Sequence, residues 1–233
     1  MNAQNLEIDV ISDVVCPWCY IGKRQLEQAL EKFKRAHPAT QVTVRWQPFQ
    51  LNPALPVEGV DRSAYLASKF GTARVGEIYQ RVKNAGAEVG LDLQIEKIDR
   101  QPNTLTVHAL ISAAQELASQ KDAQITIDAL QTGATGVAVI DPTEAFFQAY
   151  FVQGKDLTQH DVLLDLGQSI GLKAPHVEAI LKDESTRQAV ADQDLQFREM
   201  GVSGVPLFIF NRKLSVNGAQ GAAQLFKAME TTL

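Results

Sequence analysis

The chain has 233 residues, a net charge of −5, 45% apolar residues and 21% charged residues. This length can bury a large core without disulfide bonds, and the composition is ordinary for a soluble globular protein. The acidic balance argues against a broad surface for nucleic acid or for an anionic membrane, and no apolar run approaches the roughly 20 residues that span a bilayer.

The N-terminal segment predicts a strand over residues 6–15, with apolar residues at Leu6, Ile8 and Val10. It carries acids at Glu7 and Asp9 and lacks the basic region and cleavage site of a signal peptide. If the sequence is the whole translated product, we expect the protein to be cytoplasmic.

A helical pattern follows directly after this strand and ends near His37-Pro38, where proline blocks its continuation. Its apolar face holds Leu26, Ala29, Leu30 and Phe33. Residues 42–47 then alternate between apolar and polar side chains, which is typical of a strand. Strand, helix and strand in this order form a βαβ unit.

The pattern becomes helical from Val60 onward. Residues suited to cap helices precede several apolar stripes; they are Asp61, Thr72, Asn103 and Asp141. The last opens a helix with an aromatic stripe of Phe146, Phe147, Tyr150 and Phe151, which closes at Gly154. We predict further helices at about 158–171 and 185–200, and therefore a largely helical middle of the chain.

Strand patterns return near the C-terminus. A short apolar run covers residues 207–210, Asn211-Arg212 can turn the chain, and a second strand follows at Leu214 and Val216. A closing helical stripe holds Ala222, Leu225, Phe226 and Met229. The predicted plan is βαβ, a helical insertion, and then αββα.

Cys16 and Cys19 are the only cysteines in the sequence, and they flank Pro17 and Trp18 at the predicted start of the first helix. Unpaired N–H groups and the helix dipole at this position lower the pKa of a thiol. We expect Cys16 to be the more exposed, more acidic nucleophile, and Cys19 to be the buried thiol that resolves a mixed disulfide. Pro17 removes one donor, and Trp18 offers an apolar surface to the substrate.

Two other interpretations of the cysteine pair are inert buried thiols and a zinc site. A structural zinc site usually needs four ligands. None of the four histidines has ligand spacing relative to Cys16 or to another histidine; they are His37, His108, His160 and His176. We therefore predict no metal site.

The loop Gly201-Val202-Ser203-Gly204-Val205-Pro206 precedes the strand at 207–210. A proline at the first residue of a strand belongs at an entry or an edge, because it cannot donate a ladder hydrogen bond. A cis bond here would leave the backbone of Val205 free to pair with an extended substrate. The alternative is a trans proline in a glycine-rich turn, and cis is the minority state of such bonds.

These segments resemble the DsbA-like thioredoxin family. The resemblance rests on Asp13 to Tyr20, on the Gly204-Val205-Pro206 loop and on the order of elements. Its FrnE branch is suggested by Phe49 to Pro53, Pro102 to Leu105 with His108, Ala149 to Phe151, and Ser215 to Gln220. Two features depart from the branch: the segment from about Asp122 to Ile140 is longer than usual, and Asn217 replaces a smaller residue.

The resemblance implies an α/β thioredoxin fold with a large all-helical insertion. A discontinuous thioredoxin domain would comprise residues 1–59 and 182–233, and the insertion residues 60–181. It also implies a cis bond at Val205-Pro206 and thiol–disulfide exchange at Cys16 and Cys19. Substrate binding is expected at Pro17, Trp18, Val205 and Pro206.

The leading functional hypothesis is a dithiol–disulfide oxidoreductase that acts on protein or small-molecule thiols. It would have no tightly bound cofactor, and glutathione is a candidate redox partner. The alternative enzyme class comprises the 2-hydroxychromene-2-carboxylate isomerases and kappa-class glutathione transferases, which characteristically have serine at the position of Cys16. A redox-inert binding module or chaperone is a third hypothesis, against which the intact CxxC pair counts.

Four further polar residues have open roles in the sequence. Asp13 is either a buried base for Cys19 or a strand-end acid that binds backbone N–H groups. Asn52, Asn103 and His108 are candidates for substrate contact, although helix capping suffices for Asn103.

Overall fold

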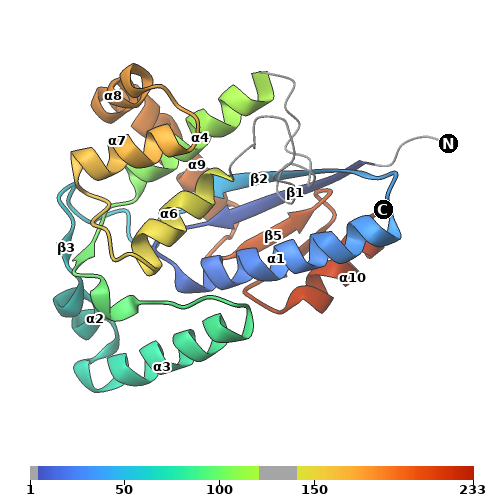
Figure 1. Cartoon of the computed structure of the whole chain (residues 1–233), viewed down its shortest axis with the longest axis horizontal. Coiled ribbons are helices and arrows are strands. Elements are labelled where there is room, and N and C mark those ends of the chain that lie inside the picture. The colour runs from blue at the N-terminus through green and yellow to red at the C-terminus, as the bar shows by residue number, and fades with distance from the viewer. Residues whose placement is uncertain (1–4, 121–140) are drawn as a thin grey trace.

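A computed structural model describes residues 5–120 and 141–233. Its centre is a four-stranded sheet with the order β2-β1-β5-β6 (Figure 1). β1 (Asn5–Ser12) runs parallel to β2 (Gln41–Pro48) and antiparallel to β5 (Leu207–Phe210), which pairs with β6 (Leu214–Asn217). The α/β prediction with two short C-terminal strands is confirmed.

The first and last helices pack together against this sheet (Figure 1). α1 (Pro17–Ala36) ends at His37, whose N–H donates to the Phe33 carbonyl. Its apolar face packs against α10 (Ala222–Thr232). The rings of Phe33 and Phe226 lie edge to face there, with 6.4 Å between their centroids. The sheet and these helices place the start of α1 beside the C-terminal end of β1.

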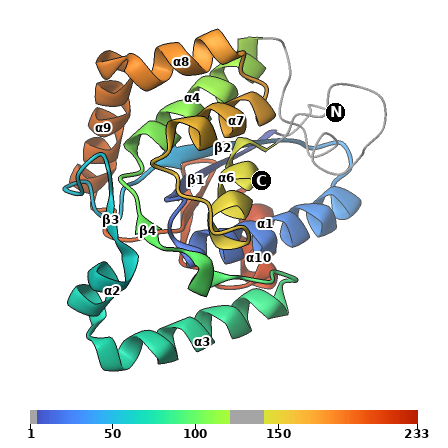
Figure 2. The ribbon, with the colours of Figure 1, turned by 60° about the vertical axis from the view of Figure 1, so that its left-hand side comes forward.

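The middle of the chain is a group of helices (Figure 2). Its elements are β3 (Val60–Asp61), α2 (Arg62–Phe70), α3 (Thr72–Glu88), the 3₁₀ turn η1 (Ile95–Lys97), β4 (Arg100–Gln101), α4 (Leu105–Gln120), α6 (Pro142–Phe151), α7 (His160–Ser169) and α8 (Ala174–Lys182). α9 (Glu184–Glu199) follows and contacts α4 and β2. The expectation of extra length at Asp122 to Ile140 falls outside the described residues.

Two details of the predicted insertion are wrong. It is not entirely helical, because β3 and β4 pair as an antiparallel two-stranded sheet, with Val60 opposite Gln101. Strands of two residues are too short to show an alternating pattern. α8 was not predicted either: no capping side chain precedes it, since Lys173 occupies its cap position, and only Val177 and Ile180 of its nine residues are buried.

Most of the predicted helix caps are present. The Asp61 side chain accepts from the Ala64 N–H at 2.7 Å, and the Asp141 side chain accepts from the Thr143 N–H at 2.9 Å. Thr72 was expected to cap α3, but it is the first helical residue, and Gly71 occupies the cap with φ of 81°. A positive φ is reached most easily by glycine.

The predicted aromatic stripe of α6 forms a large part of the core. Phe146, Phe147, Tyr150 and Phe151 are completely buried. The Phe147 ring stacks on Tyr20 of α1, with 4.9 Å between centroids. The insertion and the sheet domain therefore share one core, and we propose the division at residues 60 and 181 as a description of topology rather than of separate cores.

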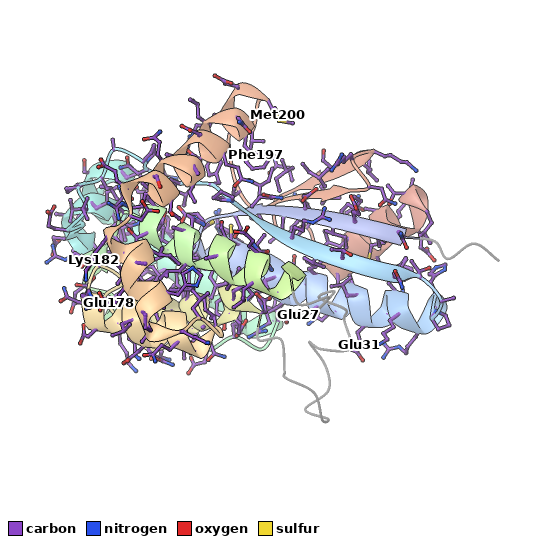
Figure 3. The ribbon with its side chains drawn as sticks, turned by 90° about the horizontal axis from the view of Figure 1, so that it is seen from above. Glu27, Glu31, Glu178, Lys182, Phe197 and Met200 are labelled. Atoms are coloured by element: carbon purple, nitrogen blue, oxygen red, sulfur yellow. The ribbon has the colours of Figure 1, made fainter. Side chains whose placement is uncertain are left out.

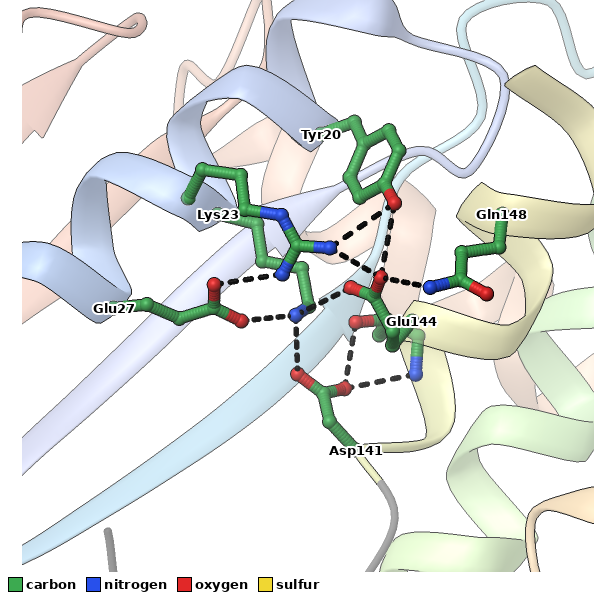
Figure 4. A network of polar contacts seen from close by, with 8 residues as sticks. Tyr20, Lys23, Glu27, Asp141, Glu144 and Gln148 are labelled. Atoms are coloured by element: carbon green, nitrogen blue, oxygen red, sulfur yellow. Dashed lines mark hydrogen bonds and ion pairs between the residues drawn. The ribbon is translucent and has the colours of Figure 1, made fainter. Parts of the chain in front are cut away.

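A partly buried network of charges, centred on the buried Lys23, joins α1 to α6 (Figure 4). The ammonium group of Lys23 is 2.7 Å from Glu144 and 3.2 Å from Asp141, and it also contacts Glu27. Arg24 pairs with Glu27 and Glu144. Burial alone would raise the pKa of Glu144, but Lys23 and Arg24 lower it below its ordinary value. The carboxylate is therefore bound in its ionised form.

Candidate active site

Cys16 lies at the turn between β1 and α1. Its N–H donates to the carbonyl of Asp13, and its own carbonyl accepts from the N–H of Cys19, both at 3.0 Å. Cys16 occupies the cap position of α1 with extended backbone, and Pro17 opens the helix. Proline suits this position because its φ is already helical and no N–H is needed. The Cys16 thiol therefore lies at a helix N-terminus, as expected.

Both thiols are free and buried. Cys16 exposes 4% of its surface and Cys19 1%, so the expected difference in exposure is small. Burial raises the pKa of Cys19 well above its ordinary value, and the adjacent Cys16 thiol raises it further. At neutral pH Cys19 therefore carries its proton, and something must remove that proton before this sulfur can attack.

The loop before β5 lies directly beside Cys16. The Val205-Pro206 peptide bond is cis, and the Cys16 thiol donates to the Val205 carbonyl oxygen at 3.7 Å. The carbonyl of Pro206 accepts from the N–H of Gly218 at 2.7 Å, which ties the loop to the end of β6. Figure 3 shows Met200 at the end of α9, where the chain enters this loop. The Met200 side chain is 74% exposed.

Gly22 lets α1 approach the Val205-Pro206 loop closely. The sequence analysis did not single out this glycine. A Cβ atom at Gly22 would lie 3.0 Å from the Pro206 ring and 3.1 Å from the Phe208 ring. Glycine inside a helix costs about 1 kcal/mol relative to alanine. That cost was the available signal that a close packing contact requires glycine here.

The insertion reaches the CPWC motif through Trp18. The half-buried indole of Trp18 has the guanidinium of Arg81, on α3, 5.4 Å from its ring centroid. A cation over an indole face is attracted by the ring electrons. α3 therefore contributes a cationic side chain next to the residue between the two cysteines.

Asp13 accepts a hydrogen bond from a backbone N–H group, as expected for a strand-end acid. It exposes 1% of its surface, and its Oδ2 accepts from the Leu51 N–H at 2.7 Å. Its Oδ1 lies 3.4 Å from Nε2 of His108. His108 is itself buried and faces Asp13, a contact that the sequence analysis did not predict. The helical pattern showed which residues share a face of α4, but not that this position faces Asp13.

Asn52 and Asn103 both form hydrogen bonds with backbone groups of the loop after β2. The Asn103 side chain accepts from the Leu105 N–H at 3.0 Å, which is the expected capping role, and donates to the Leu55 carbonyl at 2.7 Å. The Asn52 side chain accepts from the Ala54 N–H at 3.2 Å. Both therefore hold the loop after β2.

The part of the chain that the structure describes holds neither a metal-binding cluster nor a membrane-spanning helix. Within residues 5–120 and 141–233, no group of three or more histidine, cysteine or acidic side chains is placed to hold a metal ion. In the same residues, no helix has the length and apolar character to cross a membrane.

The fold and the site together define a protein of the thioredoxin-fold class with a dithiol at the start of α1. The model of the DSBA-like thioredoxin domain matches residues 7–230, and the chain belongs to this family. The resemblance found in the sequence is thereby confirmed at the level of the family.

The solved structures that are similar to the chain include the following three. A probable DsbA oxidoreductase from Streptomyces coelicolor has a TM-score of 0.77 and 24% identity, over 97% of this chain and 89% of that chain. A 2-hydroxychromene-2-carboxylate isomerase has a TM-score of 0.62 and 14% identity, over 97% and 95%. The cytosolic disulfide reductase DsbM from Pseudomonas aeruginosa, solved with GSH, has a TM-score of 0.56 and 18% identity, over 97% and 98%. At these identities the likeness establishes the fold.

Proposed function

We propose that the protein is a thiol–disulfide oxidoreductase that exchanges disulfides with protein or small-thiol substrates through Cys16 and Cys19. One observation carries the proposal: two free thiols adjoin at the N-terminus of α1, and the outer one faces the Val205 carbonyl. Membership of the DSBA-like thioredoxin family supports the same chemistry.

In the reducing direction, the Cys16 thiolate attacks one sulfur of a substrate disulfide. The substrate S–S bond breaks, a Cys16–substrate disulfide forms, and the first substrate thiolate leaves. Cys19 then loses its proton and attacks the Cys16 sulfur. The second substrate thiolate leaves, and the Cys16–Cys19 disulfide remains. The oxidising direction is the reverse of these steps.

The substrate would lie along a surface edge between the Cys16–Cys19 motif and the Val205-Pro206 loop. The backbone at Val205 and Pro206 would pair with an extended substrate segment, and Pro17 and Trp18 would contact its side chains. Arg81 beside the Trp18 ring makes this edge partly cationic. The edge would therefore accept both apolar and anionic groups next to the scissile disulfide.

Glutathione is our proposed redox partner, and no tightly bound cofactor or metal is needed. The likeness to DsbM, a cytosolic reductase solved with GSH, supports glutathione and a cytoplasmic location. The peptide carries two carboxylates, which would suit the cation of Arg81. An exchange reaction needs only a second thiol or disulfide to regenerate the site.

The second candidate is a glutathione-dependent isomerase or transferase of the 2-hydroxychromene-2-carboxylate isomerase or kappa type, favoured by the likeness to the isomerase fold. In that chemistry residue 16 only needs to stabilise the thiolate of glutathione by a hydrogen bond. A hydroxyl group can do this, and no resolving thiol is required. The two mechanisms therefore respond oppositely to Cys16→Ser.

The test measures two activities in the wild type and in Cys16→Ser: reduction of insulin disulfides and glutathione-dependent isomerisation of a chromene carboxylate. We expect the substitution to abolish disulfide reduction, because a serine hydroxyl neither ionises near neutral pH nor forms a disulfide. We expect little isomerisation by the wild type. Robust isomerisation that survives Cys16→Ser would favour the second candidate.

A further inference from the structure

A cluster of buried polar atoms lies next to Cys19. Ser12 Oγ, Asp13 Oδ1 and His108 Nε2 are three of the five buried side-chain N and O atoms without a hydrogen-bond partner in residues 5–120 and 141–233. Buried polar groups are almost always paired, since an unpaired group costs about 1–3 kcal/mol. Three such atoms on neighbouring side chains therefore indicate a function rather than a stabilising role.

The three side chains lie next to Cys19 and to one another. Ser12, at the end of β1, lies next to Cys19, and its hydroxyl group lowers the pKa of the Cys19 thiol. Ser12 and His108 line the same small cavity, together with Thr143 and Ser112. Nε2 of His108 then meets Oδ1 of Asp13 at 3.4 Å, an ion-pair distance when the imidazole is protonated.

The chemistry of the second step calls for such an arrangement. Cys19 must lose its proton before it attacks Cys16, yet burial holds its pKa well above the ordinary value. The side chain exposes only 1% of its surface, so bulk hydroxide or buffer has poor access. A buried proton acceptor beside Cys19 could take the proton despite the raised pKa, and it needs no contact with solvent.

We propose that Ser12, His108 and Asp13 form a proton relay that deprotonates Cys19 when the mixed disulfide is resolved. The inference rests on the proposed thiol–disulfide exchange. As the Cys19 proton passes to Ser12 Oγ, the proton of Ser12 moves across the shared cavity to Nε2 of His108. The Asp13 carboxylate stabilises the imidazolium ion.

The bonds and charges balance in this step. The Cys19 sulfur forms a bond to the Cys16 sulfur, the Cys16–substrate bond breaks, and the substrate leaves as a thiolate with the electron pair of that bond. The proton taken from Cys19 remains on His108, and it returns to Cys19 when the Cys16–Cys19 disulfide is reduced again. No other oxidant or reductant is needed.

The charged groups around the relay have their own partners. Arg62 of α2 donates to Gln101 and to the Tyr150 hydroxyl of α6. Asp194 of α9 pairs with Arg198 at 2.8 Å. Cys16 is the other titratable group beside Cys19. The Asp13–His108 pair is therefore the acceptor best placed to change its charge during turnover.

The test separates the two chemical steps. Reduced protein is mixed with oxidised glutathione, quenched with acid at short times, and analysed by mass for the Cys16–glutathione disulfide. Formation of this species reports the attack by Cys16, and its decay reports the attack by Cys19. For Ser12→Ala and His108→Gln we expect unchanged formation and a decay at least about tenfold slower, since general acid–base groups contribute 10²–10⁴-fold.

Two comparisons distinguish the relay from a merely structural role. Ser12→Thr keeps a hydroxyl and should restore the decay rate that Ser12→Ala loses. His160→Gln changes a histidine that is 60% exposed, and should behave as the wild type. We also expect the decay of His108→Gln to keep rising with pH where the wild-type rate has levelled off.

Decay within twofold of the wild type in both Ser12→Ala and His108→Gln would overturn the relay while leaving the exchange chemistry intact. If the wild type forms no Cys16–glutathione disulfide and turns over no insulin, the proposed function fails at its first step. That outcome would be visible before any relay variant is compared. Should His108→Gln not fold, the pair Ser12→Ala and Ser12→Thr decides alone.

Discussion

The Cys16 thiol lies 3.7 Å from the carbonyl oxygen of Val205, although 189 positions separate the two residues. This contact joins the start of α1 to the loop before β5. The close approach at Gly22, one turn after Cys19, holds the same two segments together. The position of the thiol therefore depends on packing between α1 and the loop as well as on the motif itself.

Gly22→Ala should destabilise the protein and slow insulin reduction. The new methyl group would press on Pro206 and Phe208, and overpacking of this kind costs about 1–3 kcal/mol. Alanine also gains about 1 kcal/mol of helix propensity over glycine. The overpacking cost is at least as large as this gain, so the variant should not gain stability. Urea unfolding and the insulin assay measure the two effects.

Gly76→Ala is the matched control, because Gly76 also lies within a helix but has nothing within 4 Å of an added Cβ. It should gain stability by the propensity term and keep full activity. Equal gains in the two variants would show that Gly22 does not hold α1 against the loop.

Phe147→Ala should reduce the free energy of unfolding by about 3–5 kcal/mol, because it removes a fully buried ring that stacks on Tyr20. Phe70→Ala is the comparison, since the ring of Phe70 is 37% exposed and its loss should cost far less. A loss below 1 kcal/mol for Phe147→Ala in urea would show that the insertion and α1 do not share a core.

Glu144→Gln should cost about 1.5–3 kcal/mol at pH 7, because charge-assisted hydrogen bonds to Lys23 and Tyr20 are weakened. The pKa of Glu144 is lowered in the folded protein from its ordinary value of 4.5. Its stabilising effect is therefore complete above pH 4.5 and is lost as the pH falls through the lower folded value.

The difference in stability between the wild type and Glu144→Gln should consequently shrink in acid. Glu31→Gln is the control, since Glu31 is an exposed residue of α1 (Figure 3) and pairs with Arg35 on the surface. Surface pairs of this kind contribute up to about 1 kcal/mol. A difference that stays constant from pH 7 to pH 3 would contradict the ionised network.

Much of the fold was predictable because its patterns are strong and local. The strand over Leu207–Phe210 agrees residue for residue with the prediction, and the aromatic stripe of α6 is buried as expected. The caps at Asp61 and Asp141 follow from a side chain and an N–H that are neighbours in the chain. Such features need no knowledge of the tertiary structure.

The parts that were missed depend on contacts between distant residues. Periodicity shows which face of α4 is apolar, but not that His108 meets Asp13 across 95 positions of sequence. The packing of Gly22 on Pro206 is of the same kind. The pairing of β3 with β4 was missed because two residues are too few to carry a pattern.

Cys19→Ser tests most directly whether Cys16 forms a covalent bond with the substrate and Cys19 then releases it. The variant is incubated with oxidised glutathione, and the intact mass and the modified residue are determined. We predict one glutathione per chain, attached to Cys16, which persists because no thiol remains to release it, whereas the wild type passes through this state to a Cys16–Cys19 disulfide. A Cys19→Ser variant that carries no adduct on Cys16, or that reduces insulin disulfides as fast as the wild type, would contradict the account.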